Sequence, residues 1–383
     1  MKKTVLYSVL SAMSVCFVSC GHPPVRSINA NDKIIEIEVV SVIDTVINRT
    51  SPGTEDNKYG FEGGRVVKVR DTYHLFTAEM YDDIRWVSMR LGHWESKNGI
   101  DWHRVGTVRQ SDGDRTGSSQ RATTWGPMVV FNDEDNRWHL VYVCYKSKPD
   151  EPNAWYLNYD GVIQHAVSTV EGEIGIYGPY EDKEILLRYD DNPDPWEGLQ
   201  GTDSFFPYKI GKKWYAFYGS ATTQDVANCE WHIGLAQANR IEGPWKRMSE
   251  LNPIDVGGFA ENPIVMQLDN GVYIAIVDGY FERPGYTLSW DGLHWSNIRY
   301  IDIASATDKW WTMMRTPLSL IKEDNGTYTM FFTAYKNYAE TLHNSVDDKP
   351  ATTESQVLTI TNDFLFGCVS KAILKINLLT NHN

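Results

Sequence analysis

The chain has 383 residues, 42% of them hydrophobic and 13% aromatic. That length is typical of two or three domains, although all-β propellers and barrels of this size form single units. The formal net charge of −14 at pH 7 argues against nucleic acid, or an anionic membrane surface, as a partner.

The N-terminus has the pattern of a secretory signal. Lys2 and Lys3 precede a short apolar run that ends in Ser-Cys-Gly, and the run is too short to span a membrane as a mature helix. The ending resembles a bacterial lipobox, so residues 1–19 are expected to be removed and Cys20 to carry a lipid. An ordinary signal peptide with an incidental cysteine is the alternative.

This pattern predicts a lipid-anchored protein of the bacterial cell envelope that touches the membrane through its anchor alone. Facing the periplasm and facing the outside remain open. We expect an anchor and one closing strand in residues 20–50, and a catalytic domain in residues 51–383.

The rest of the chain is dominated by short alternating strands that end in Gly, Asn or Asp turns. One hairpin plan recurs in chain order. It consists of a polar or aromatic lead residue, an apolar strand, a turn and an aromatic-rich second strand. The five copies begin at Phe61, Thr124, Thr202, Phe259 and Met314.

A weaker hairpin follows the copies, so that each unit becomes four antiparallel strands. The segments from His93 and Leu288 share an Asn-Gly or Asp-Gly turn followed by Trp, and two others share Gly-Pro-aromatic. One such sheet cannot bury its own faces, so neighbouring units must supply the core. The lead residues are spaced 54 to 78 residues apart. This pattern predicts an all-β fold, a five-bladed β-propeller of four-stranded blades.

The last unit is the least regular. Its outer strands are expected at 355–366 and 367–378, and residues 33–47 are expected to close the ring as an added strand. Residues 337–355 are polar and rich in turn formers, so we expect an exposed loop there.

The register of the repeats brings one residue of each unit to the same mouth of the central channel. Glu62, Asp203 and Glu261 each lie twelve residues before an equivalent position of the second strand. Trp125 and Arg315 occupy the same slot in the second and fifth units. One carboxylate ahead of a strand is often solvated or caps a turn, but three in one register with an arginine favour a functional cluster.

Glycosidic bond cleavage needs such a cluster. Crowding and burial raise the pKa of at least one carboxyl group, whereas Arg315 holds another ionised. One acid can then protonate the leaving oxygen, while a second carboxylate activates water or attacks the sugar directly.

At these residues, and in the motifs ENP and TDSFFP, the sequence resembles the five-bladed propeller glycoside hydrolases. It is most similar to glycoside hydrolase family 43 and its relatives, which include arabinofuranosidases and β-xylosidases. The resemblance covers about residues 55–375. It implies a poly- or oligosaccharide substrate and inversion, with Glu62 as general base, Asp203 as pKa modulator and Glu261 as general acid. Related retaining families would make Glu62 a nucleophile.

Two positions depart from that family. Glu62 stands in FEGGR, where the family has Asp followed by Pro. We expect the neighbouring Arg65 to pair with it and to belong to the substrate-binding residues. Arg315 replaces a histidine that is common in the fifth blade, and is expected to bind the sugar or to tune the acids. Further walls of the substrate site are expected at Trp125, Trp196, Trp310 and Trp311, each of which could equally be structural.

No metal or cofactor is expected from the sequence. Cys144, Cys229 and Cys368 lie far apart, without CxxC or histidine at ligand spacing. Some relatives carry a calcium ion on the propeller axis, but no acidic loop here demands one. His165 is expected to be a strand residue.

The alternatives to an enzyme are a non-catalytic carbohydrate-binding propeller and a propeller that binds proteins. The first has no reason to keep three acids in register with an arginine, and the polar mouth of the channel argues against the second.

Overall fold

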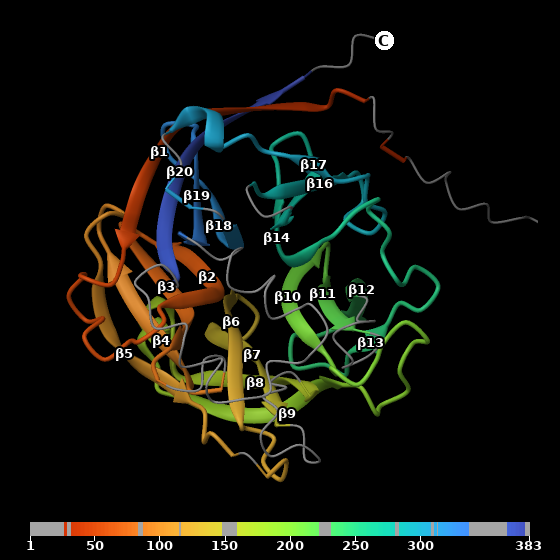
Figure 1. Ribbon diagram of the computed structural model, residues 1–383. Coiled ribbons are helices and arrows are strands. Elements are labelled where there is room, and N and C mark those ends of the chain that lie inside the picture. Colours follow the sequence, from red (N-terminus) through yellow and green to blue (C-terminus); the bar gives the residue numbers. More distant parts are fainter. Residues whose placement is uncertain are drawn as a thin grey trace, which may run out of the picture.

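A computed structural model describes most of the chain. In this structure, five four-stranded antiparallel sheets surround a common axis (Figure 1). The expected five-bladed β-propeller is thus confirmed. None of the helices in the described segments has the length and apolar character of a membrane span. The described residues are 27–28, 32–82, 87–114, 116–147, 159–221, 231–279, 283–307, 310–311, 313–336 and 366–379.

The first four blades are built from consecutive strands. Short 3-10 turns, η1 (Glu173–Tyr177) and η3 (Ala304–Ala306), lie in connections. Blade one contains β2 (Phe61–Val69), β3 (Thr72–Met80), β4 (Met89–Ser96) and β5 (His103–Gln110), and blade two contains β6 (Thr123–Asn132), β7 (Arg137–Lys146), β8 (Tyr159–Glu171) and β9 (Tyr180–Arg188). Blade three contains β10 (Asp203–Ile210), β11 (Lys213–Ala221), β12 (Trp231–Ala238) and β13 (Lys246–Arg247), and blade four contains β14 (Glu261–Gln267), β15 (Tyr273–Asp278), β16 (Gly285–Ser289) and β17 (Arg299–Tyr300).

Both ends of the chain form the fifth blade. Its order is β18 (Met313–Lys322), β19 (Tyr328–Tyr335), β20 (Cys368–Leu378) and then β1 (Ile35–Ile47). Figure 1 shows the red-orange β1 beside the dark-blue β20. The prediction that residues 33–47 close the ring is confirmed, and β1 is part of the propeller.

In the described part of the chain, β20 and β1 fill the two outer places of this sheet, and the outer strand predicted at 355–366 falls almost entirely outside it. Of that segment, only Phe366 lies in the described part of the chain. The expected signal peptide, Cys20, Cys229 and the expected loop at 337–355 lie outside the described residues.

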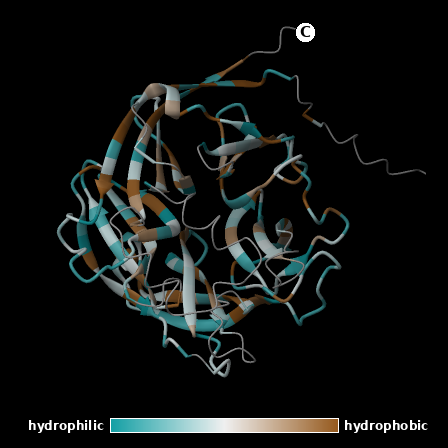
Figure 2. Cartoon of the chain, in the orientation of Figure 1, coloured by the Kyte–Doolittle hydropathy of each residue, from teal (hydrophilic) through white to brown (hydrophobic). Residues whose placement is uncertain are grey.

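The core lies between the blades, as β7 illustrates. Alternate residues of this strand face opposite sides of the sheet. Leu140 and Tyr142 pack toward blade one, beside Phe76, whereas Val141 and Val143 pack toward blade three. Each side chain buried in this way stabilises the fold by about 2 kcal/mol. Hydrophobic and hydrophilic residues accordingly intermingle along the strands (Figure 2).

The first strand of each blade is the innermost one. These five strands, β2, β6, β10, β14 and β18, contact one another in ring order. The residue that begins each of them therefore lies near the axis, where side chains from different blades can meet.

Candidate active site

A β-bulge follows the lead residue of four innermost strands. The pairing register shifts directly after Glu62, Trp125, Asp203 and Glu261. In the fifth blade the shift lies between Met314 and Pro317, around Arg315. A bulge bends its strand and redirects the side chain beside it, so the same device sets all five lead residues at the mouth of the channel.

In four blades the residue after the lead position has a left-handed backbone. The φ angles are 71° at Gly63 and 50° at Gly126, and they are 53° at Ser204 and 50° at Asn262. Glycine adopts this conformation freely and asparagine tolerates it, but for Ser204 it is strained. The surrounding structure must therefore hold Ser204 in place.

Hydrogen bonds between blades three and four provide that support. The Ser204 hydroxyl donates to Oδ1 of Asn262 at 3.0 Å. The amide nitrogen of Asn262 donates to Oδ2 of Asp278, at the end of β15, at 3.1 Å. The bulges that carry Asp203 and Glu261 are thus fixed to each other.

Arg315 joins the carboxylates of two other blades. Its Nε donates to Oε1 of Glu62 at 2.7 Å, and its Nη1 donates to Oε2 of Glu261 at 2.8 Å. The same Nη1 lies 3.5 Å from Oδ2 of Asp278. Blade five stands between blades four and one in the ring, which is why its arginine can reach both.

Glu62 has a second donor at the same site. The hydroxyl of Tyr335, the last residue of β19, donates to its Oε2. Only 2% of Glu62 is exposed, so these two contacts provide stabilisation that water would otherwise supply. Both contacts favour the ionised carboxylate, which is the form that a general base or a nucleophile needs.

Burial has the opposite effect on the other acids. Burial and the negative charge of Glu261 raise the pKa of Asp203 to about 7, although the nearby Tyr145 hydroxyl, the Ser204 N–H and Arg315 oppose this rise. Burial also raises the pKa of Glu261, with Arg315 opposing and Glu62 adding to the shift. The site thus combines a carboxylate held by two donors with acids that retain a proton more readily than usual.

Asp278, which the sequence did not single out, also belongs to the site. Burial raises its pKa well above the usual range, and Arg315 only partly offsets this. Its Oδ1 is buried, with no hydrogen-bond partner among the described residues. One sequence position could have identified the residues that were missed. It is the end of the second strand of a blade, beside the mouth, where Tyr145, Asp278 and Tyr335 lie.

The tryptophans that the sequence predicted as walls of the substrate site differ in their exposure. Trp125 is half-buried at the mouth, and a methyl group at Gly63 would lie 3.7 Å from its Nε1. Trp196 and Trp311 are 7% and 1% exposed. Trp196 packs against Tyr218, and Trp311 packs against Phe332 and Trp310. Trp196 and Trp311 therefore offer no open face to a sugar, which corrects that expectation.

Arg65 does not make the expected ion pair with Glu62 in the described structure. Its guanidinium carbon lies 4.7 Å from the centre of the Phe206 ring, and its Nη1 has no hydrogen-bond partner among the described residues. The register of β2 shifts between Glu62 and Gly64, so a bulge separates the two side chains.

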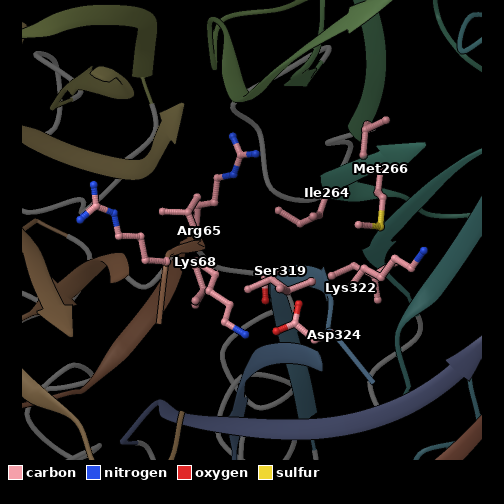
Figure 3. Close-up of a pocket in the computed structure, with 13 residues that line it drawn as sticks. Arg65, Lys68, Ile264, Met266, Ser319, Lys322 and Asp324 are labelled. Carbon is pink, nitrogen blue, oxygen red and sulfur yellow. The ribbon is translucent and has the colours of Figure 1, made fainter. Parts of the chain in front are cut away.

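Arg65 instead lines a cavity of about 460 Å³ formed by β2, β14 and β18 beyond the carboxylates (Figure 3). Lys68 and Lys322 line the same cavity, but Lys68 pairs with Glu323 and Lys322 with Asp269.

A second cavity, of about 540 Å³, lies beside Glu261. Trp231, Ile254 and Phe259 are among its lining residues. Trp231 begins β12, and its Nε1 donates to the carbonyl oxygen of Ala260 at 3.2 Å. Its ring covers Gly219, the residue that pairs with Asp203. An aromatic face thus lies next to two of the acids.

Comparison with known proteins identifies the architecture. No protein-family model matches the sequence, and no curated protein matches it. A solved structure described as a glycoside hydrolase is 14% identical, with a TM-score of 0.59 over 88% of this chain and 92% of its own. The chain shares the five-bladed propeller fold of such enzymes.

Two further structures support the same conclusion. A family 117 glycoside hydrolase of the marine bacterium Zobellia galactanivorans is 11% identical, with a TM-score of 0.55 over 91% of this chain and 92% of its own. An α-L-arabinofuranosidase of Podospora anserina, in complex with cellotriose, is 10% identical, with a TM-score of 0.54 over 88% of this chain and 96% of its own. The likeness extends over the whole ring of blades.

Proposed function

We propose that this protein is a glycoside hydrolase that cleaves a poly- or oligosaccharide at the mouth of the propeller channel. The observation that carries the proposal is the cluster itself. One guanidinium, from Arg315, contacts both Glu62 and Glu261, while burial raises the pKa of Glu261 and of Asp203. Such a separation of protonation states among neighbouring carboxyl groups is how enzymes assign acid and base roles near neutral pH.

In this mechanism Glu261 protonates the oxygen of the leaving sugar. Glu62, held as a carboxylate by Arg315 and Tyr335, accepts a proton from the attacking water on the other side of the ring. Asp203, whose pKa the charge of Glu261 helps to raise, takes the role of pKa modulator that the resemblance to family 43 implies. Inversion is proposed on the resemblance of the sequence to family 43.

The substrate is proposed to be an arabinofuranoside or a xyloside. The sequence resemblance and the solved α-L-arabinofuranosidase of the same fold support this class. Trp125 and the cavity at Trp231 and Phe259 would provide aromatic faces for the sugar rings. The lipid anchor at Cys20 is part of the same proposal, since it would hold the enzyme in the cell envelope next to imported or surface glycans.

A panel of aryl glycosides of arabinofuranose, xylose, galactose and uronic acids tests the proposal. We expect turnover of at least one member of the panel. The anomeric configuration of the first product, measured by NMR, should be opposite to that of the substrate. Retention would make Glu62 a nucleophile and would contradict the proposed inversion. If the folded protein binds the corresponding glycans but hydrolyses none of these glycosides, the proposal is wrong and the protein is a carbohydrate-binding propeller.

A further inference from the structure

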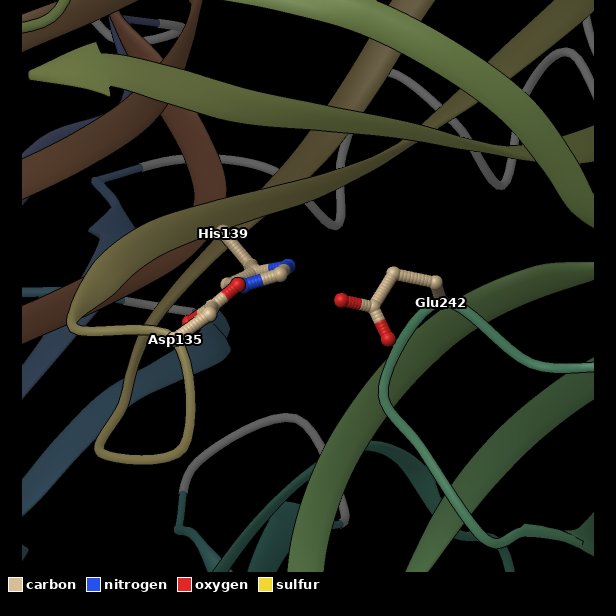
Figure 4. A group of neighbouring side chains, drawn as sticks. All are labelled: Asp135, His139 and Glu242. Atoms are coloured by element: carbon tan, nitrogen blue, oxygen red, sulfur yellow. The ribbon is translucent and has the colours of Figure 1, made fainter.

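A second group of ionisable side chains lies between blades two and three. Asp135 is in the turn between β6 and β7, His139 is in β7, and Glu242 is in the turn between β12 and β13. One ligand atom of each lies within 4.8 Å of those of the other two. Figure 4 shows the carboxylates of Asp135 and Glu242 near the ring of His139.

This group is remote from the axial carboxylates. Strand β6 begins beside the mouth, at the level of Trp125, and Asp135 follows its other end. The group therefore takes no part in the proposed hydrolysis, and a ligand bound there would be held for another purpose.

Within the group, the single imidazole can donate to only one of the two carboxylates at a time. Nε2 of His139 lies 2.9 Å from Oδ2 of Asp135. That nitrogen carries one proton at most, so it cannot satisfy the carboxylate of Glu242 as well. Outside the group, Glu242 has its own backbone N–H and Arg240 as donors. The Arg240 contact, at 3.2 Å, runs through a side chain that is 71% exposed, where an ion pair contributes little. A cation between the three groups would balance both carboxylates.

A contact of the other ring nitrogen fixes the orientation of His139. Its Nδ1 lies 2.8 Å from Nε2 of His165, and the two fully buried rings are stacked at 10°. Nδ1 of His165 has no partner among the described residues, so a neutral His165 can keep its proton there and accept from His139. With an ion bound, His139 would carry its proton at Nδ1, and its Nε2, which faces Asp135, would be free to bind the ion. Metal-binding histidines are typically held by such a contact of the other ring nitrogen.

We propose that Asp135, His139 and Glu242 bind a divalent transition-metal ion, for which zinc is the best match, and that this ion links blades two and three. Zinc accepts one imidazole nitrogen and two carboxylate oxygens, with ligand atoms about 3.3 Å apart in a tetrahedral site. The side chains of Asp135 and Glu242 are 33% and 29% exposed, so an ion can enter and water can complete the coordination.

No motif in the sequence points to this site, and the expectation of no metal followed from cysteine and histidine spacing. Glu242 is separated from His139 by 103 positions, and the propeller alone brings the two blades together. The turn at 132–136 does form the expected hairpin, but one of its acids, Asp135, faces the neighbouring blade.

Isothermal titration of ZnCl₂ into the chelator-treated protein, purified without a histidine tag, tests the site. We expect one ion per chain, with a Kd in the low micromolar range or below, and much weaker binding of CaCl₂. Saturating zinc should raise the Tm by a few degrees, because an ion that binds only the native state stabilises it.

Glu242→Gln should weaken zinc binding at least tenfold and remove the rise in Tm. Glu242 lies on a turn and is partly exposed, so this variant is expected to fold. Glu134→Gln is the matched control, since it removes a carboxylate from the β6–β7 turn that pairs with Lys209 and is not part of the group. The proposal is overturned if the wild type binds no zinc, or if Glu242→Gln and Glu134→Gln bind it equally well.

Discussion

Asp203 is buried near the negative charge of Glu261, and its pKa is raised from 3.8 to about 7. At pH values between these two pKa values, Asp203 keeps its proton in the native protein but loses it in the unfolded chain. The stability that comes from this proton is fully present below about pH 4 and is lost as the pH rises through about 7. The site is therefore expected to destabilise the fold at alkaline pH.

Asp203→Asn should remove this pH dependence, because an amide has no proton to lose in that range. Measured by denaturant unfolding at pH 5 and pH 8, the stability of the variant relative to wild type should increase by on the order of 3 kcal/mol toward pH 8. Asp269→Asn, on an exposed turn, is the control and should show no such trend. Parallel pH profiles for Asp203→Asn and wild type would contradict the assignment.

The sequence was sufficient to place Glu62, Asp203, Glu261 and Arg315 together, because the hairpin arms can be counted from the turn. Their partners on the second strands could not be found in this way. Without a bulge, the pairing of Ile264 with Ile276 would set Glu261 opposite Gly279, but the observed partner is Asp278. Whether a tryptophan packs inward or faces the mouth depends on neighbouring blades, and a pattern within one blade does not show it.

At the scale of elements, the bulge in β2 depends on glycine. Gly64 has a φ of 128°, and a Cβ there would lie 2.0 Å from the carbonyl oxygen of Phe76 on β3. No other residue fits this backbone without moving the strand that carries Glu62.

Gly64→Ala should therefore destabilise the protein by about 2–4 kcal/mol and reduce any hydrolytic activity, through displacement of Glu62. Gly106→Ala, also in blade one, introduces a methyl group with nothing within 4 Å and should cost little. Denaturant unfolding of both variants gives the comparison. Equal stabilities for Gly64→Ala and Gly106→Ala would show that the bulge is not constrained as described.

The elements themselves were largely predictable, because each blade has clear turns and alternating strands. The fifth blade was harder, since its outer strand comes from the other end of the chain. In the described part of the chain, β1 takes the outer place and pairs with β20. The composition of residues 33–47 indicates a strand, but it does not identify the partner strand.

At the scale of the whole molecule, the ring closes through blade five, which both ends of the chain form. Strand β1 completes the fifth blade through its ladder with β20. At the mouth, the Phe61 N–H donates to the carbonyl oxygen of Gly367 at 3.0 Å, and the Gly367 N–H donates to that of Tyr59 at 2.9 Å. Blade one is thereby tied to blade five, which positions Glu62 beside Arg315.

A truncated chain that begins at Asn48 lacks β1 and should be less stable, whereas a chain that begins at Asp32 keeps the pairing of β1 with β20. The shorter chain lacks the buried side chains of Ile35, Val46 and Ile47, a loss of roughly 5 kcal/mol, and leaves β20 as an unpaired edge that favours self-association. Thermal unfolding and size-exclusion chromatography of the two chains give the comparison. Indistinguishable Tm values and elution profiles would mean that β1 is dispensable.

The central claim is that the propeller brings Glu261 to a glycosidic oxygen as a proton donor, and its most direct test is the leaving-group dependence of Glu261→Gln. On glycosides with a poor leaving group, which need protonation, turnover should fall about 10²–10⁴-fold. On the matching 2,4-dinitrophenyl glycoside, whose leaving group needs no proton, the loss should be far smaller. Near-normal turnover on both substrates, or equal loss on both by a correctly folded variant, would contradict the account.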